Sequence, residues 1–291
     1  MPKKSSEGSM REESKDPGLF KLFNDGELTI FFVGCGSAFS RTMNQTNILV
    51  VKGDQHLLVD CGTKSPQALH DLHIEPAQIE NFLITHTHAD HIGGLEEMMM
   101  VNRYLTGKRP NIIINEEFET ILWNQSLRGG SAYSEVNNGQ PLGFTDFWNI
   151  VRPTRAADIE RETWETRLGD LDIKMPRTKH FPDNAKSWRD SFWSCGVLFD
   201  ERVLFTSDTR FDPDLLIEFD ERYKLELIFH DCQFFTGGVH ASLDELSTLP
   251  DSLKSKMVLM HYGDNWQQFE EQVKAAGFLS FAKQNHSYTF E

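Results

Sequence analysis

The chain has 291 residues, 39% of them hydrophobic, and a formal net charge of −15, so it can bury a large core as one big α/β domain or two smaller ones. The acidic charge argues against a general nucleic-acid surface, which needs clustered Lys and Arg, and no apolar run approaches the roughly 18 to 20 residues of a membrane span. Residues Met1 to Pro17 are rich in Lys, Glu and Ser and lack the apolar core of a signal peptide, so we expect a disordered tail over 1–17, one domain over 18–291 and a cytoplasmic location.

Short β-like runs open the domain. Residues 28–33 read as a strand ended by Gly34, and runs over 46–51 and 56–59 form a predicted hairpin across the turn at 53–54. Asp60 follows the third strand and precedes a helix predicted over 64–72. Capping of that helix is one open role for Asp60.

The densest cluster of chemically active residues comes next. A strand predicted over 82–85 leads into His86, His88, Asp90 and His91, and a Gly-Gly turn then leads into a helix predicted over 95–105. Imidazole nitrogens and carboxylate oxygens bind divalent transition metals. Four such residues within six positions at a strand end are hard to explain as a chance polar loop, and they predict a metal site.

The middle of the chain continues the alternation of strand and helix, with a strand predicted over 111–115 and a helix over 116–127. Residues 128–141, which begin Arg-Gly-Gly-Ser, have loop composition and are long for a plain connection. We interpret them as a lid or an interface loop, and a passive surface insertion is an equally open alternative.

Three further candidate ligands each follow an apolar or β-like segment. His180 comes after the segment 171–175, Asp208 after 203–206, and His261 after 257–260. Each signal is weak alone, but together they place further candidate ligands at strand ends.

The pattern His86-x-His88-x-Asp90-His91 resembles the signature of the metallo-β-lactamase superfamily. The resemblance implies an α/β fold, the αββα sandwich, in which two mixed β-sheets are flanked by helices and the metals lie where strands end. It also implies the site roles, with Asp60 orienting a metal-binding histidine and two divalent ions per chain, most simply Zn²⁺ with Mn²⁺ or Fe as alternatives. The implied ligands are His86, His88 and His180 for one ion, Asp90, His91 and His261 for the other, and Asp208 as the bridge.

Two later stretches narrow the branch. His230-Asp231-Cys232-Gln233 and Val239-His240-Ala241-Ser242 resemble the tRNase Z-like phosphodiesterase branch, in which a His-Glu-Ala-Thr motif precedes a His-Ser element. Asp231 takes the position of the glutamate, which departs from the pattern but keeps a carboxylate. The resemblance implies that His240 is the general acid, that Asp231 orients it and that Asp90 completes the catalytic set. The alternative for His240 is a surface residue that caps a helix over 242–246.

Two features argue against tRNase Z itself. Only 27 residues separate His180 from Asp208, which leaves little room for a tRNA-gripping arm, and the acidic charge does not suit tRNA. From Leu28 onward the chain instead resembles the small cyclic-nucleotide phosphodiesterases, including the phage anti-Pycsar enzymes, above all over 239–246 and 261–266.

That resemblance implies hydrolysis of a 3′,5′-cyclic nucleotide to the monophosphate by a metal-bridged hydroxide, in a homodimer whose partner contributes to the active-site lid. The loop around Gly129 and Gly130 is the candidate lid. Phe181 and Tyr262 adjoin candidate ligands, so we expect them to contact the base, with packing in the core as the commoner role of such aromatics. The alternatives are a tRNase Z-like ribonuclease, a lactone or thioester hydrolase, and a non-enzymatic metal-stabilised sensor.

Overall fold

The computed structural model describes residues 10–14 and 20–291, and within these ranges the strands form two eight-stranded mixed sheets and one small hairpin. In spatial order the first sheet contains β1 (Met10–Ser14), β18 (His286–Phe290), β2 (Leu28–Gly34), β3 (Asn47–Lys52), β4 (Gln55–Val59), β5 (Asn81–Leu83), β6 (Asn111–Ile113) and β9 (Asn149–Val151). The second contains β10 (Thr154–Arg155), β11 (Thr163–Leu168), β12 (Leu171–Pro176), β13 (Val197–Phe199), β14 (Val203–Phe205), β15 (Leu227–Asp231), β16 (Met257–Met260) and β17 (Ser280–Phe281). The hairpin pairs β7 (Val136–Asn137) with β8 (Gln140–Pro141).

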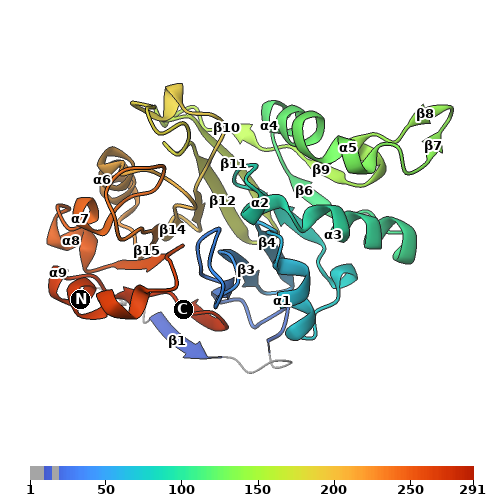
Figure 1. Ribbon diagram of the computed structural model, residues 1–291. Helices are drawn as coiled ribbons and strands as arrows, with labels where there is room; N and C mark the ends of the chain where they lie inside the picture. Colours follow the sequence, from blue (N-terminus) through green and yellow to red (C-terminus); the bar gives the residue numbers. More distant parts are fainter. Residues whose placement is uncertain (1–9, 15–19) are drawn as a thin grey trace, which may run out of the picture.

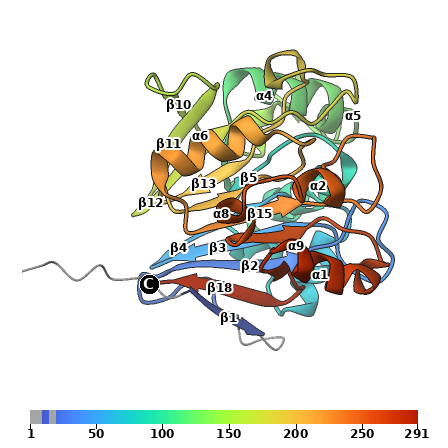
Figure 2. The ribbon, with the colours of Figure 1, turned by 90° about the vertical axis from the view of Figure 1, so that its left-hand side faces the viewer.

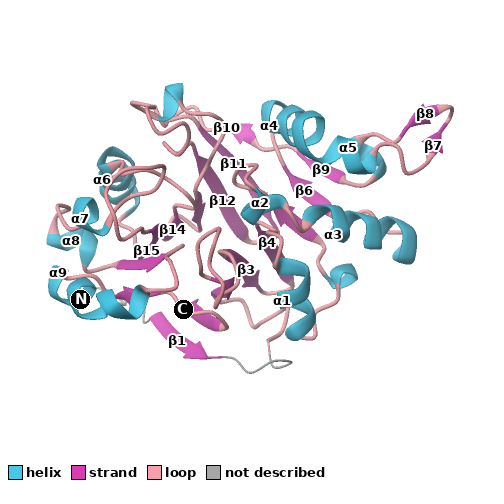
Figure 3. Ribbon diagram, viewed as in Figure 1, coloured by secondary structure: helices cyan, strands magenta, loops and turns pink. Residues whose placement is uncertain are grey.

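Helices flank the two sheets on their outer faces (Figures 1 and 3). Those on the side of the first sheet are α1 (Ser65–Asp71), α2 (Ala89–Ile92), α3 (Leu95–Val101), α4 (Glu116–Leu122) and α5 (Arg128–Ser131). Those on the side of the second are α6 (Pro213–Tyr223), α7 (Leu243–Leu246), α8 (Asp251–Lys254) and α9 (Glu270–Ala276). Single turns complete the set: the π-helical η2 (Asn102–Thr106) and η3 (Trp123–Leu127), and the 3₁₀ turns η1 (Pro76–Gln78), η4 (Phe144–Asp146), η5 (Trp188–Asp190) and η6 (Trp266–Phe269). The predicted αββα class is confirmed.

Strand β2 explains why the layers stack in this order. Its side chains alternate between faces, so that Ile30 and Phe32 join the hydrophobic cluster between the sheets, whereas Phe31 and Val33 join a second cluster with the helices α1, α3 and α4. Both faces are therefore buried, which requires the near-continuous apolar run seen in the sequence. Figure 2 shows the sheets as separate layers, with β2 to β4 in one and β12, β13 and β15 in the other.

The predicted disordered tail is wrong for residues 10–14, which form β1 and pair antiparallel with β18 from Met10 opposite Phe290 to Ser14 opposite His286. This strand has no apolar alternation, and it forms because the edge of β18 offers unpaired backbone groups. The rest of the expected tail, 1–9 and 15–17, lies outside the described residues.

Residues 128–141 are not a loop throughout, because α5 extends the preceding turn and β7–β8 closes tightly through Asn138 and Gly139, whose φ angles are 50° and 79°. Asn-Gly is the preferred pair for such a two-residue hairpin turn. The hairpin projects from the edge of the molecule (Figure 1).

Within the described ranges, no helix is long and apolar enough to cross a membrane. The four cysteines are buried and unpaired among these residues.

Candidate metal centre and active site

The site lies at one edge of the sandwich because parallel strands from both sheets end there. β4 pairs in parallel with β5, and β14, β15 and β16 run parallel to one another. Carboxyl ends of parallel strands meet at the same edge. Asp60 follows β4, the His86–His91 segment follows β5, Asp208 follows β14, Asp231 ends β15 and His261 follows β16.

Three site residues have left-handed backbone conformations, with φ of 63° at Asp60, 51° at Ser207 and 58° at His261. Each follows a strand and costs roughly 1–3 kcal/mol in a non-glycine residue. Gly62 allows the closest approach between segments, because a Cβ there would lie 2.0 Å from the carbonyl oxygen of Asp90. The turn after β4 therefore docks directly on α2.

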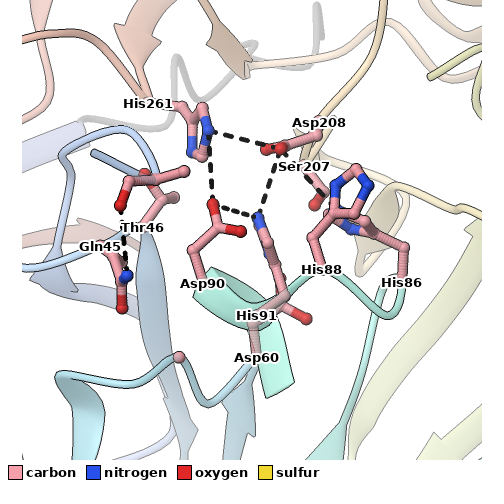
Figure 4. A network of polar contacts seen from close by, with 12 residues as sticks. Gln45, Thr46, Asp60, His86, His88, Asp90, His91, Ser207, Asp208 and His261 are labelled. Atoms are coloured by element: carbon pink, nitrogen blue, oxygen red, sulfur yellow. Dashed lines mark hydrogen bonds and ion pairs between the residues drawn. The ribbon is translucent and has the colours of Figure 1, made fainter. Parts of the chain in front are cut away.

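The structure brings the seven predicted ligands together in two groups that share Asp208. Figure 4 shows His86, His88, Asp90, His91, Asp208 and His261. In the first group, Nε2 of His86 and Nε2 of His180 each lie 3.1 Å from Nδ1 of His88. Nitrogens bound at about 2.0–2.1 Å to a tetrahedral zinc ion lie roughly 3.3 Å apart. The spacing of these three nitrogens therefore fits one metal ion.

The second group surrounds the carboxylates of Asp90 and Asp208. Nε2 of His91 lies 3.3 Å from a carboxylate oxygen of each, and Nε2 of His261 lies 3.4 Å from Oδ2 of Asp208 and 3.7 Å from Oδ2 of Asp90. Oδ2 of Asp208 is also 3.8 Å from Nε2 of His86. This one oxygen faces both groups, as the predicted bridge requires.

Several buried atoms of the site have no hydrogen-bond partner among the described residues, namely Nε2 of His91, Oδ1 of Asp208 and both ring nitrogens of His261. Buried polar atoms are normally paired, since an unpaired one costs about 1–3 kcal/mol. Divalent ions at the two groups would satisfy Nε2 of His91, Nε2 of His261 and the carboxylate of Asp208, so the residues present fit a dinuclear centre.

Asp60 is fully buried and accepts hydrogen bonds from Nδ1 of His91 at 2.7 Å and from the backbone N–H of Thr85 at 2.8 Å. Its side chain caps no helix, because α1 has no side-chain N-cap hydrogen bond. The Nδ1 proton of His91 is directed at Asp60, so Nε2 is the nitrogen that faces the site. The orienting role of Asp60 stays a prediction.

The protonation equilibria follow from burial and from the two carboxylates. Burial lowers the pKa of His86 well below its usual value and that of His180 to about 4, so both rings are neutral and offer lone pairs. His91 is different, because the carboxylates of Asp208 and Asp90 outweigh burial and raise its pKa well above the usual value. Burial alone would raise the pKa of Asp208. The imidazoles of His261, His91 and His240, with His261 the strongest, outweigh burial and hold this pKa well below its usual range.

His240 and Asp231 lie beside the two groups. Nδ1 of His240 is 2.9 Å from Oδ2 of Asp231, and Asp231 also accepts from the backbone N–H of Thr209 at 3.1 Å and lies 3.1 Å from Nδ1 of His230. Burial is outweighed by Asp208 and Asp231, which raise the pKa of His240 to about 9. Asp231 therefore holds the His240 ring by its Nδ1, and this side chain does not cap a helix. Ser242 caps α7 instead.

A cavity of about 430 Å³ opens onto this site. Its volume is in the range of small-molecule sites. Its lining residues include His88, Asp90, Asp208, His240 and Phe181, together with Ala38, Phe39, Gln45, Thr63, Ala89 and Val239. The ring centre of Phe181 lies 5.5 Å from that of His88, and its predicted contact with the base stays a prediction.

The prediction for Tyr262 is wrong. This side chain is 1% exposed and packs between the sheets, where its hydroxyl donates to the carbonyl of Ala282 and contacts the sulfur of Cys35. Adjacency to His261 therefore does not bring Tyr262 into the site. The 128–141 segment contributes nothing to the cavity lining of its own chain.

Comparison with known proteins identifies the family. The family model described as Anti-Pycsar protein Apyc1 matches residues 28–288. The chain belongs to the Apyc1 family. It is 38% identical over 263 residues to the Apyc1 of Bacillus phage BSP38, covering 89% of this chain and 97% of the relative. It is also 33% identical over 264 residues to that of Paenibacillus xerothermodurans, covering 90% and 98%.

A solved metallo-β-lactamase fold protein, YhfI from Bacillus subtilis, has the same fold as the Apyc1-family chain. Its TM-score is 0.67 at 15% identity, with 90% of this chain and 99% of that chain covered. The predicted metallo-β-lactamase fold is confirmed.

Sequence reasoning missed three contributors to the site of this Apyc1-family chain. Thr85 contacts both oxygens of Asp60 and receives a hydrogen bond from Ser207 Oγ at 2.8 Å. The carbonyl of Val239 lies 2.8 Å from Nδ1 of His180 and fixes that ring. Thr85 and Ser207 directly precede His86 and Asp208, so adjacency could have flagged them, but a backbone carbonyl leaves no trace in the sequence.

Proposed function

We propose that this protein is a metal-dependent phosphodiesterase that hydrolyses 3′,5′-cyclic nucleotides to nucleoside monophosphates. The observation that carries the proposal is the His240–Asp231 pair, whose imidazole lines the same cavity as His88, Asp90 and Asp208 of the groups suited to metal ions. Membership in the Apyc1 family supports the same activity.

The metal assignment follows the two groups. His86, His88 and His180 would hold one ion, Asp90, His91 and His261 the second, and Asp208 both. An all nitrogen and oxygen ligand set favours zinc among the common divalent metals. When bound, such a pair supplies an acidified water as the nucleophile and neutralises charge on the phosphoryl oxygens.

The protein's own acid acts on the leaving group. Cleavage of a cyclic phosphodiester releases a sugar alkoxide, a poor leaving group unless it is protonated as the P–O bond breaks. His240 carries the proton, and its raised pKa keeps it charged at neutral pH. Asp231 is a positioning residue that holds the ring by its Nδ1, which leaves Nε2 as the donor to substrate.

Size and charge favour a small substrate. The cavity of about 430 Å³ suits a mononucleotide, and the net charge of −15 opposes a long polyanion. The segment between His180 and Asp208 holds only η5, β13 and the short β14. A tRNA-gripping arm has no place there.

We also propose a cytoplasmic homodimer. The support is a group of exposed apolar side chains on η2 and around the β7–β8 hairpin, with exposed fractions of 78% at Leu105, 69% at Tyr133 and 67% at Val136. Such side chains commonly mark protein contacts. Light scattering of the purified protein tests this assembly.

The decisive experiment measures metal content together with hydrolysis of 3′,5′-cyclic nucleotides, bis(p-nitrophenyl) phosphate, a lactone and a thioester. We expect two metals per chain and turnover of the phosphodiesters. His240→Ala should keep the metal content and slow phosphodiester cleavage by roughly 10²- to 10⁴-fold, while the exposed-site control His70→Ala should match the parent. Activity confined to the lactone or thioester, unchanged in His240→Ala, would refute the proposal.

A further inference from the structure

The cavity contains one aromatic side chain that its own fold does not use. Phe39 is 90% exposed and yet lines the cavity beside His88, Asp90 and His240. A phenylalanine that leaves most of its apolar surface in water forfeits the transfer free energy that normally buries it. Phe181, which is 40% exposed, also lines this cavity, but Phe39 leaves far more of its ring uncovered.

The loop that carries Phe39 is held firmly. Asp264 accepts hydrogen bonds from Ser40 Oγ at 2.5 Å, from the Arg41 backbone at 2.8 Å and from Thr42 Oγ1 at 2.8 Å. Nζ of Lys64 donates to the carbonyls of Ser40 and Met43 at 2.7 and 2.8 Å. An exposed ring on an anchored loop is a preformed contact surface, because little conformational entropy is lost when a ligand covers it.

Phe181, which also lines this cavity, has more of its ring covered by neighbouring side chains. Its ring stacks on Phe192 with centroids 5.3 Å apart and meets His88 edge-on. The free ring faces of Phe39 are therefore the better platform for a flat ligand. Small apolar walls at Ala38, Ala89 and Val239 continue this surface toward the His and Asp groups.

We infer that Phe39 is a specificity-determining residue that stacks on the nucleobase of the substrate while the cyclic phosphate lies at the His and Asp groups. The inference rests on the proposed function and deepens it, since it commits the site to phosphodiesters that carry a base. Aromatic stacking tolerates every base because each has a π-face. Phe39 thus selects nucleotides over other phosphodiesters without selecting one nucleotide.

The test compares Phe39→Ala, Phe39→Trp and the control Phe23→Ala, which removes a 57% exposed phenylalanine from a different surface pocket. Metal-loaded proteins are assayed on adenosine 3′,5′-cyclic phosphate and on the base-free methyl riboside 3′,5′-cyclic phosphate. Binding of a hydrolysis-resistant phosphorothioate analogue of the adenosine compound is measured by calorimetry. Light scattering records the oligomeric state of each variant.

We expect Phe39→Ala to weaken analogue binding and raise KM for the adenosine substrate by roughly 5- to 150-fold, the range of one base–aromatic stack. The kcat on that substrate and the turnover of the base-free substrate should stay near the parent values. Phe39→Trp should restore binding, and Phe23→Ala should change nothing.

Unchanged analogue binding and KM in Phe39→Ala would overturn the inference. An equal loss on the base-free substrate, or an altered oligomeric state, would also overturn it, because Phe39 would then be a loop or interface residue. If the parent binds the analogue through Phe39 but cleaves neither cyclic phosphate, the proposed function fails and the Phe39 contact stands.

Discussion

Asp60 offers a sharp test of how the fold prepares the metal centre. Asp60→Ala removes the acceptor of two buried donors, the backbone N–H of Thr85 and Nδ1 of His91. The Thr85 hydroxyl keeps another neighbour, Nδ1 of His86 at 3.1 Å. Removing one partner of a buried charged pair costs about 3–5 kcal/mol. The free energy of unfolding of the metal-free protein should fall by this amount.

Asp60→Asn is the matched variant, because asparagine also tolerates the left-handed conformation of this position, with φ of 63°. Its carbonyl still accepts from Thr85, but its NH₂ group faces Nδ1 of His91. The ring must then carry its proton on Nε2, the nitrogen that faces Asp90 and Asp208. The variant should lose less folding stability than Asp60→Ala and still bind metal about 10- to 100-fold more weakly than the parent.

Two measurements separate these effects. Chemical denaturation in the presence of a chelator gives the stability of the metal-free fold, and competition against a chromophoric chelator gives zinc affinity. Parental zinc affinity in Asp60→Asn would refute the argument that Asp60 sets the His91 tautomer, and it would leave Asp60 a purely structural residue.

Three further predictions address the bridge, the Phe39 loop and a buried histidine outside the site. Asp208→Ala should lower metal content below two per chain and abolish turnover. In thermal melts, zinc at about 1,000 times its Kd should stabilise the parent by about 4 kcal/mol per site and the variant by less. Equal stabilisation of parent and variant would contradict the bridging role of Asp208. Asp264→Ala removes the acceptor of the Arg41 backbone N–H and the Ser40 hydroxyl. The KM for cyclic nucleotides should therefore rise, as in Phe39→Ala, with kcat nearly unchanged. A fall confined to kcat would count against a role of Asp264 in positioning Phe39. Burial lowers the pKa of His56, whose Nε2 accepts from the Glu80 N–H at 2.9 Å. The unfolded chain binds a proton at His56 below about pH 6.5, whereas the folded chain resists this protonation. The free energy of unfolding should therefore fall as pH drops from 8 to 5, more steeply in the parent than in His56→Gln, and parallel curves would exclude His56 as a cause.

Most strands of the sandwich were predictable from the sequence because they are buried on both faces. Runs such as 28–33 are apolar except for Thr29, and tertiary packing does not need to override their propensity. β1 shows the limit of this reasoning, since residues 10–14 are polar and become a strand only through the backbone of β18. Nothing in their composition distinguishes them from a tail.

The candidate site divides in a similar way. Most residues of the two groups were predictable because they follow β5, β14 or β16, whose apolar pattern is clear, and parallel pairing brings the ends of such strands together. His180 follows β12, which pairs antiparallel with its neighbours. Tyr262 was mistaken because adjacency along the chain does not fix the side on which a residue lies. Phe39 had no signal, because its exposure depends on hydrogen bonds to Asp264, a residue far along the chain.

The positions of Asp60 and Asp264 indicate a common design for the two halves of the cavity. Each carboxylate gathers backbone and side-chain donors from a different segment, Asp60 from the β5 end and Asp264 from the loop after β2. The buried one organises imidazoles around the metal positions, and the exposed one organises the loop that carries Phe39. If both arguments hold, Asp60 variants should change metal affinity and keep the preference for cyclic nucleotides over the base-free substrate. Asp264 variants should change KM and keep the metal content. Such a separation would show that the chemistry and the recognition of the base are built on independent supports, whereas coupled losses would show that the loop and the metal positions fold as one unit.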